Sequence, residues 1–288
     1  MKLLDLPFLA DITAIRRDIH AHPELAFEEA RTADVVAQAL ESSGVEVHRG
    51  LAGTGVVGVI KGTQGSSGRM VGLRADMDAL PMPELNEFPH RSRHSGRMHA
   101  CGHDGHTAML LGAARYLAEH RDFDGTVVLI FQPAEEGEGG ARVMIEQGLF
   151  QQFPVEAVFG LHNWPGLPVG QMAIMPGPVM AGTCGLEILI RGHGCHAAMP
   201  HQGVDTILVG TQVIQALQTV ISRNLHPCEA GVISITQFHA GDAWNVACVV
   251  KTSASCPNEQ APDFDFGAGT ILAKGKNGRE FVLAGQKS

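Results

Sequence analysis

Three apolar segments share a pattern that constrains the fold, because each leads at its carboxyl end into side chains that can bind a metal or move a proton. The segments 70–74, 126–131 and 157–161 lead respectively to Asp76 and Asp78, to Glu135 and Glu136, and to His162. Each end alone is as well explained by a solvated turn, a helix N-terminus or an isolated polar histidine. Together they predict an open α/β sheet, whose chemistry lies at the carboxyl ends of its strands.

The stretch 98–106 reads MHACGHDGH and brings one thiol, three imidazoles and one carboxylate into nine residues. Thiolate, imidazole and carboxylate are the side chains that bind divalent transition metals. The alternative is a polar loop that caps the following helix through Asp104 or Thr107. The acids at 135–136, His162 and a later His196 favour the metal site. On an extended segment the neighbours Glu135 and Glu136 point opposite ways, so one could bind metal while the other addresses a water.

Hydrophobic periodicity predicts the remaining elements. We expect helices near 12–22, 32–43, 107–120 and 141–149, and further strands near 45–48, 55–60 and 169–175. A boundary follows at 176–178. Beyond it, a strand at 186–191, a helix at 205–224 and a strand at 231–237 predict a smaller α+β layer.

Composition excludes several classes of protein. The chain has 288 residues, is 44% hydrophobic and 18% charged, and carries a net charge of -9, which predicts a packed core and argues against a nucleic-acid binder. We expect no signal peptide, and no apolar run reaches the ~18 residues that span a membrane. The six cysteines are scattered, which fits a reducing, cytoplasmic location without a disulfide framework.

With these residues placed, the chain resembles the metal-dependent amidohydrolases that include hippurate hydrolases, N-acyl-amino-acid amidohydrolases and auxin-conjugate hydrolases. The resemblance covers about residues 10–246, through RRDIHAHPEL, LRADMDALP, MHACGHDGH, QPAEEGEGG, LHNWP, CHAAMPH and TQFHAGDAWNV. It implies an α/β, zinc-peptidase-like catalytic domain with a mostly parallel central sheet over 1–181. It also implies a smaller α+β lid over 182–246 that forms a homodimer. Both domains are expected to be incomplete.

The resemblance also implies a site for two divalent ions (Mn, Zn, Co or Ni). Its implied metal ligands are Cys101, which bridges the ions, His103, Glu136 and His162. Glu135 resembles the general base, and His196 resembles a lid histidine that stabilises the oxyanion, typically in the partner subunit's site. Asn245 matches a position near the substrate's carboxylate. Asp76 or Asp78 is expected to orient a ligand, and the motif does not choose between them.

Two features depart from the family pattern. Cys195 stands where the family usually has glycine, in a turn that favours a positive φ. Residues 247–288 contain short strings that resemble pyrroloquinoline-quinone-type propeller dehydrogenases, and Asn277-Gly278 predicts a β-hairpin turn. We therefore expect a truncated amidohydrolase joined to a propeller fragment. Its sheet is expected to have an open edge, and its second ion, without the family's last histidine, to bind weakly or not at all.

The function expected from these residues is hydrolysis of the amide bond of small N-acyl or N-aroyl amino acids. The alternative is an inactive remnant that binds metal or a partner without turnover. A third hypothesis, a quinone-linked dehydrogenase, is supported only by residues 247–288. No nucleic-acid or membrane partner is expected.

Overall fold

The computed structural model describes residues 6–65, 67–177 and 182–240, and describes 247–256, 271–274 and 280–283 as backbone alone. The chain divides into two compact units, residues 1–171 and 172–288. The sequence-based boundary lay after residue 181. Among the described residues, no helix is both long and apolar enough to cross a membrane.

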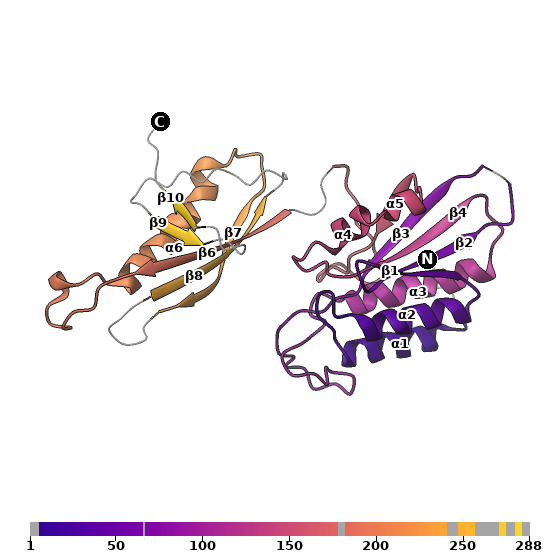
Figure 1. Ribbon diagram of the computed structural model, residues 1–288, viewed down its shortest axis with the longest axis horizontal. Helices are drawn as coiled ribbons and strands as arrows, with labels where there is room; N and C mark the ends of the chain where they lie inside the picture. The colour runs from indigo at the N-terminus through magenta and orange to yellow at the C-terminus, as the bar shows by residue number, and fades with distance from the viewer. Residues whose placement is uncertain are drawn as a thin grey trace. The chain divides into compact units, whose positions relative to one another are not determined.

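The first unit is an α/β layer structure (Figure 1). Its described strands form one sheet in the order β1-β2-β4-β3-β5, where β2 runs against the other four, so the expected mostly parallel sheet is confirmed. The strands are β1 (Glu46–Leu51), β2 (Gly55–Lys61), β3 (Met70–Asp76), β4 (Thr126–Gln132) and β5 (Ala157–Gly160). The helices are α1 (Leu9–Ala21), α2 (Ala30–Ser42), α3 (His103–Glu119), α4 (Gly140–Glu146) and α5 (Leu149–Gln152).

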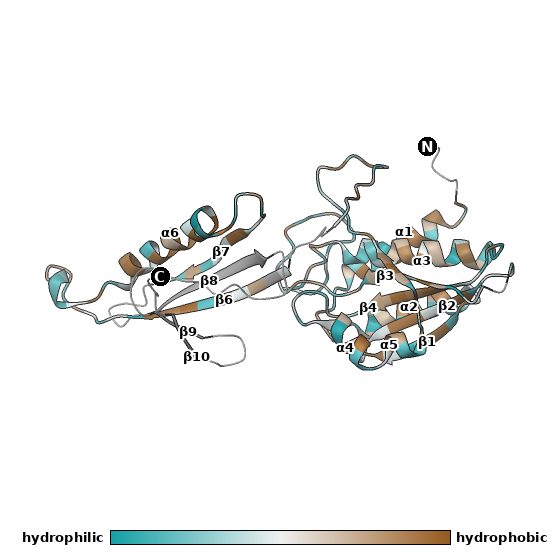
Figure 2. Ribbon diagram, turned by 90° about the horizontal axis from the view of Figure 1, so that it is seen from above, coloured by the Kyte–Doolittle hydropathy of each residue, from teal (hydrophilic) through white to brown (hydrophobic). Residues whose placement is uncertain are grey.

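Alternating residues of the central strands build a core on each face of this sheet. On one face, Leu129 and Phe131 of β4 belong to a cluster with α2 and α3 side chains. On the other face, Val128 and Ile130 belong to a cluster with Met144 of α4 and Leu149 of α5. This pattern explains why β4 is hydrophobic along its length (Figure 2).

Strand β5 is more exposed than the sequence predicted. The pattern at 157–161 predicted a buried strand, but Val158 and Phe159 are exposed. Within the described residues β5 pairs only with β3, over the four residues Ala157–Gly160, and so forms the edge of the sheet. The predicted strand at 169–175 is wrong, since no strand forms there and Val169 and Ile174 are exposed. Strand propensity without a pairing partner is insufficient.

The second unit is a sheet with one long helix. Its described strands have the order β10-β9-β6-β8-β7, and every pair is antiparallel. Helix α6 packs on it through Leu217, which contacts Ile188 and Ile233 in one cluster. The elements are β6 (Gly182–Arg191), a short 3-10 helix (Pro200–Gln202), α6 (Thr206–Asn224), β7 (Val232–His239), β8 (Ala247–Cys256), β9 (Ile271–Lys274) and β10 (Glu280–Leu283).

The segment 247–288, expected to be a separate tail, contributes strands to this sheet, and β8 lies between β6 and β7. Strands β9 and β10 pair as a hairpin would, while the Asn277-Gly278 turn lies outside the described residues.

Candidate metal centre

The ends of β3, β4 and β5 meet the first turn of α3, as the three strand ends predicted. Possible ligand atoms there form three groups. Within each group the atoms lie within 4.8 Å of one another, and every group includes His103. The groups are Cys101, His103 and His162; His103, Glu135 and Glu136; and Asp76, His103 and His106. The expected ligands Cys101, His103, Glu136 and His162 are therefore neighbours in space.

His103 lies at the centre of the cluster and is fully buried. Its Nδ1 donates to Asp78 Oδ1 at 3.2 Å. Its Nε2 has no hydrogen-bond partner among the described residues, although carboxylate oxygens surround it. They are Asp76 Oδ2 at 3.7 Å, Glu135 Oε2 at 3.8 Å and Glu136 Oε1 at 3.8 Å.

Electrostatics make this pocket attractive to a cation. Burial alone lowers the pKa of His103, but the hydrogen bond to Asp78, the nearby Cys101 thiol and the charge of Asp76 raise that pKa overall. A lone buried nitrogen facing several carboxylates and a thiol is the donor set that a divalent transition metal prefers. The residues present therefore fit a metal ion.

The two adjacent glutamates converge on the same atom. Because residues 133–139 are not a strand, the expectation that Glu135 and Glu136 point opposite ways is wrong. Ala134 has a φ of 52°, and the Gly137 N–H donates to the Glu135 carbonyl at 2.7 Å, so the chain turns there. The two side chains still differ in exposure, 42% for Glu135 against 25% for Glu136.

Glu136 has the more enclosed carboxylate. Its Oε1 is buried without a hydrogen-bond partner among the described residues. Burial raises the pKa of Glu136 and the charge of Glu135 raises it further, against the attraction of His103. A buried carboxylate oxygen without a donor is suited to a metal ion, whereas the more exposed Glu135 is open to a water or a substrate.

Cys101 and His162 close one side of the cluster, with 3.3 Å between the thiol sulfur and Nε2. Their two loops approach closely at Gly102, which has a φ of 88°. A Cβ at this position would lie 2.7 Å from Asn163 Oδ1. Only glycine fits both the left-handed backbone and this contact, so Gly102 allows the loop before α3 to reach the loop after β5.

The two candidate orienting acids have different partners. Asp78 holds His103 through Oδ1 and accepts the Glu136 N–H through Oδ2 at 2.9 Å. Asp76 instead accepts from His106 Nδ1 at 2.6 Å and from Arg74 at 2.7 Å. The sequence left open which of the two acids orients a ligand. In the structure Asp78 contacts His103, whereas Asp76 contacts His106.

His106 is a member of the cluster that the sequence analysis did not assign. Its Nε2 lies 3.0 Å from the Asn163 backbone nitrogen and also contacts the Asn163 side-chain oxygen, while its Nδ1 lies 2.6 Å from Asp76 Oδ1. His106 thereby ties the end of β3 to the loop that carries His162. Its spacing of three residues from His103, on one helix face, is a signal that could have identified it.

A second set of polar groups, around the buried Asp104, fixes the start of α3 to α1. Asp104 accepts from Arg16 Nε at 3.1 Å and from His20 Nδ1 at 3.0 Å. Burial by itself raises the pKa of Asp104, but the hydrogen bond to His20 and the positive charges around it lower that pKa overall. The same hydrogen bond raises the pKa of His20. These contacts fix the helix turn that presents His103.

Two expected site residues belong to the second unit by sequence. His196 belongs to the second unit, where it is exposed and its Nδ1 accepts the Ala198 N–H at 3.1 Å. Asn245 lies outside the described residues. Cys195 is not among the described non-glycine residues with a positive φ, so the expected backbone conflict there does not occur.

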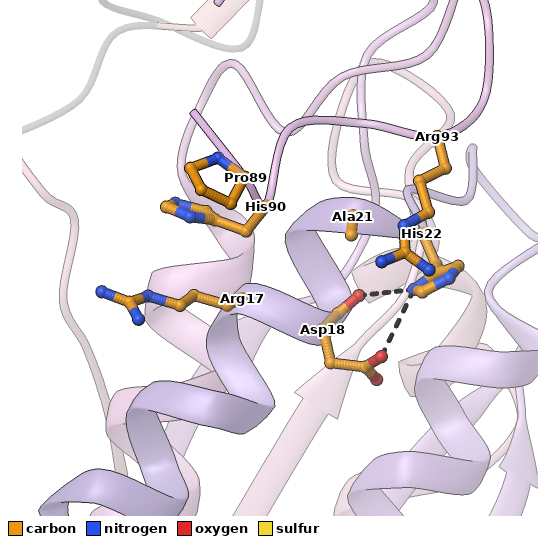
Figure 3. A pocket seen from close by; sticks show the side chains of 7 residues that line it. All are labelled: Arg17, Asp18, Ala21, His22, Pro89, His90 and Arg93. Carbon is orange, nitrogen blue, oxygen red and sulfur yellow. Dashed lines mark hydrogen bonds and ion pairs between the residues drawn. The ribbon is translucent and has the colours of Figure 1, made fainter. Parts of the chain in front are cut away.

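A cavity of about 380 Å³ is lined by residues of α1 and of the loop 89–93 (Figure 3). Its lining is largely basic, and its acid, Asp18, is bound by Arg31 at 2.8 Å. The side chains that line it are Arg17, Asp18, Ala21, His22, Pro89, His90 and Arg93. None of these belongs to the expected ligand set, so the metal cluster remains the candidate site.

The fold and this cluster define an α/β protein with a thiol–imidazole–carboxylate metal centre at the carboxyl ends of its strands. Residues 72–268 match the model of Peptidase family M20/M25/M40, and the chain belongs to this family. The match includes β8, in the segment that we expected to be a tail.

Two curated relatives carry informative names. The chain is 46% identical over 251 residues to hippurate hydrolase of Campylobacter jejuni, covering 87% of this chain and 64% of the relative. It is 47% identical over 239 residues to N-acyl-L-amino acid amidohydrolase of Geobacillus stearothermophilus, covering 82% and 63%. The chain spans about half to two thirds of the length of the curated relatives it matches.

Solved structures of similar proteins agree with this family assignment. A dinuclear metal-binding peptidase of the M20 family from Bacillus subtilis superposes with a TM-score of 0.64 at 36% identity, covering 88% of this chain and 65% of that one. An aminohydrolase structure from methicillin-resistant Staphylococcus aureus gives a TM-score of 0.70 at 38% identity, covering 87% and 67%.

Proposed function

We propose that this protein hydrolyses the amide bond of N-acyl or N-aroyl amino acids, with the cluster around His103 as its metal centre. The observation that carries the proposal is the buried Nε2 of His103, which has no hydrogen-bond partner among the described residues and faces three carboxylates. The named activities of the hippurate hydrolase and N-acyl-amino-acid relatives support this substrate class.

Four side chains would hold up to two divalent ions (Mn, Zn, Co or Ni). They are Cys101, which would bridge the ions, His103, Glu136 and His162. When bound, such an ion lowers the pKa of a coordinated water toward neutrality and polarises the substrate carbonyl. Asp78 would keep the ring of His103 in place, because a ligand histidine is oriented by the acceptor of its other nitrogen.

Glu135 would act as the general base. Its carboxylate lies beside the cluster yet is partly exposed, so it can reach both a water and the scissile amide. It takes one proton from the water whose oxygen attacks the carbonyl carbon, and it then gives that proton to the leaving nitrogen as the C–N bond breaks. The products are a carboxylic acid and a free amino acid.

The remaining roles come from the family resemblance. His196 would stabilise the oxyanion in the site of a partner subunit, through a homodimer formed by the second unit. Asn245 would contact the carboxylate of the substrate. A cytoplasmic location fits the scattered cysteines.

The test combines metal content per purified chain with hydrolysis of N-benzoylglycine by the same sample. Bound metal together with turnover supports the proposal. Bound metal without turnover supports the alternative, in which the chain binds metal or a partner but does not catalyse. A sample with neither overturns the assignment of the cluster as a metal centre in this chain.

A further inference from the structure

The loop 133–140 carries the proposed base and a proposed ligand and is irregular. Within the loop, the Gly137 N–H donates to the Glu135 carbonyl and the Gly140 N–H donates to the Ala134 carbonyl at 2.9 Å. At Gly140 a Cβ would lie 1.9 Å from the Pro133 oxygen, so the turn is tight. These contacts shape the loop but do not attach it to the rest of the unit.

Two buried carboxylates from distant parts of the chain make that attachment. Asp78 accepts the N–H of Glu136 at 2.9 Å. Glu29 accepts the N–H of Ala134 through Oε1 at 2.8 Å, across 105 residues of sequence. Ala134 is one of the few described non-glycine residues with a positive φ. Glu29 therefore binds the backbone at the point where the chain takes its least favourable conformation.

Glu29 is held in place by hydrogen bonds alone. It is fully buried, and no cation forms an ion pair with it among the described residues. Its second oxygen accepts from the Thr54 hydroxyl at 2.7 Å. A buried acid without a cation is costly unless its hydrogen bonds serve a purpose. In keeping with that cost, burial raises the pKa of Glu29, although hydrogen bonds from Thr54 and from the backbone of Glu29, Ala134 and Phe27 oppose the rise.

Helix capping does not explain Glu29. It occupies the N-cap position of α2, yet its side chain makes no capping hydrogen bond. Glu24 binds the start of that helix instead, since its carboxylate accepts the N–H groups of Arg31 at 3.0 Å and Thr32 at 2.7 Å. The two glutamates thus make similar numbers of hydrogen bonds but bind different targets.

We propose that Glu29 is a positioning residue, which holds the turn at Ala134 so that Glu135 and Glu136 face His103. This inference rests on the proposed function, because it assigns Glu29 to the support of that site. Glu29→Ala should free the Ala134 N–H and weaken metal binding by roughly 10- to 100-fold, the usual range for residues that support metal ligands.

Two further variants separate positioning from general stability. Glu29→Gln keeps a side-chain oxygen for the Ala134 N–H and offers its amide to the Thr54 hydroxyl, so it should restore most of the affinity. Glu24→Ala is the matched control. It removes two hydrogen bonds from the same segment and should lower the melting temperature while metal affinity stays at the wild-type value.

The experiment uses the full chain and two readouts. Hydrogen exchange of peptides covering 133–141 is measured first on metal-free protein, and Zn²⁺ affinity is then measured by competition with a chelating dye. Faster exchange of 133–141 in Glu29→Ala, but not in Glu29→Gln or Glu24→Ala, supports the inference. Unchanged exchange in Glu29→Ala overturns it. So does equal weakening of Zn²⁺ binding by Glu29→Ala and Glu24→Ala.

The same design separates this inference from the proposed function. A wild-type chain that binds no Zn²⁺ contradicts the proposed metal centre, while the metal-free exchange still decides whether Glu29 holds the turn. If Glu29→Ala does not fold, Thr54→Val takes its place, because it removes the hydroxyl that fixes the other carboxylate oxygen. It should speed exchange over 133–141, and exchange at the wild-type rate would overturn the inference.

Discussion

Replacing Asp78 with asparagine should damage the metal centre through two contacts at once. The side chain is fully buried, and its oxygens accept from His103 Nδ1 at 3.2 Å and from the Glu136 N–H at 2.9 Å. An asparagine has one oxygen and one NH₂ group. Whichever way its amide is turned, either the histidine or the backbone N–H faces another donor.

The expected magnitude follows from these two contacts. A hydrogen bond to a charged group contributes about 1.5 to 3 kcal/mol, and a buried donor left unpaired costs about 1 to 3 kcal/mol more. The free energy of unfolding of Asp78→Asn should therefore fall by about 3 kcal/mol. Metal affinity should fall by roughly 10- to 100-fold, because the ring of His103 loses the acceptor that orients it.

Urea unfolding of metal-free protein and Zn²⁺ titration measure the two effects separately. Asp18→Asn is the control, since Asp18 binds Arg31 at the surface, and its loss should cost less than about 1 kcal/mol without changing metal affinity. Wild-type Zn²⁺ affinity in Asp78→Asn would refute the reasoning, whatever happened to stability.

Three further predictions concern other members of the cluster. Glu135→Gln should abolish turnover while metal content stays intact. A full rate of turnover in this variant would show that Glu135 is not the general base. Cys101→Ser should lower metal content per chain, measured after dialysis beside wild type. Burial opposes the low pKa of Asp76, but His106, His103 and Arg74 lower it from 3.8 to about 2. Asp76 should therefore contribute about 2 kcal/mol of stability above about pH 4, lost as pH falls toward 2. Urea unfolding across that range should show a flatter curve for Asp76→Asn than for wild type.

The parts of the fold that could be predicted from sequence depend on local patterns. Helix periodicity placed α1, α2 and α6 because each buries one face, and apolar runs placed β2, β3 and β4. The convergence of acids and histidines also followed, since carboxyl ends of parallel strands meet at one edge. Cys101 and His103 were identifiable because their spacing is short.

The remainder depends on contacts between distant residues. Which acid holds His103 could not be read from a two-residue spacing, because the answer depends on where α3 lies against β3. Glu29 was missed because its partner, Ala134, is 105 residues away. The similarity of the tail to propeller dehydrogenases stays a prediction, since residues 257–270 lie outside the described part of the chain.

The edge strand β5 has a consequence for how quickly metal can leave. Asp76, His103 and His106 are buried, but His162 is exposed and follows a four-residue strand in which Phe159 is 60% exposed. Short exposed elements open locally at much lower free energy than the core. Metal should therefore escape through brief detachment of β5, without global unfolding. The rate of metal release should then follow the amide exchange rate of β5, and a release rate that followed global unfolding would contradict this.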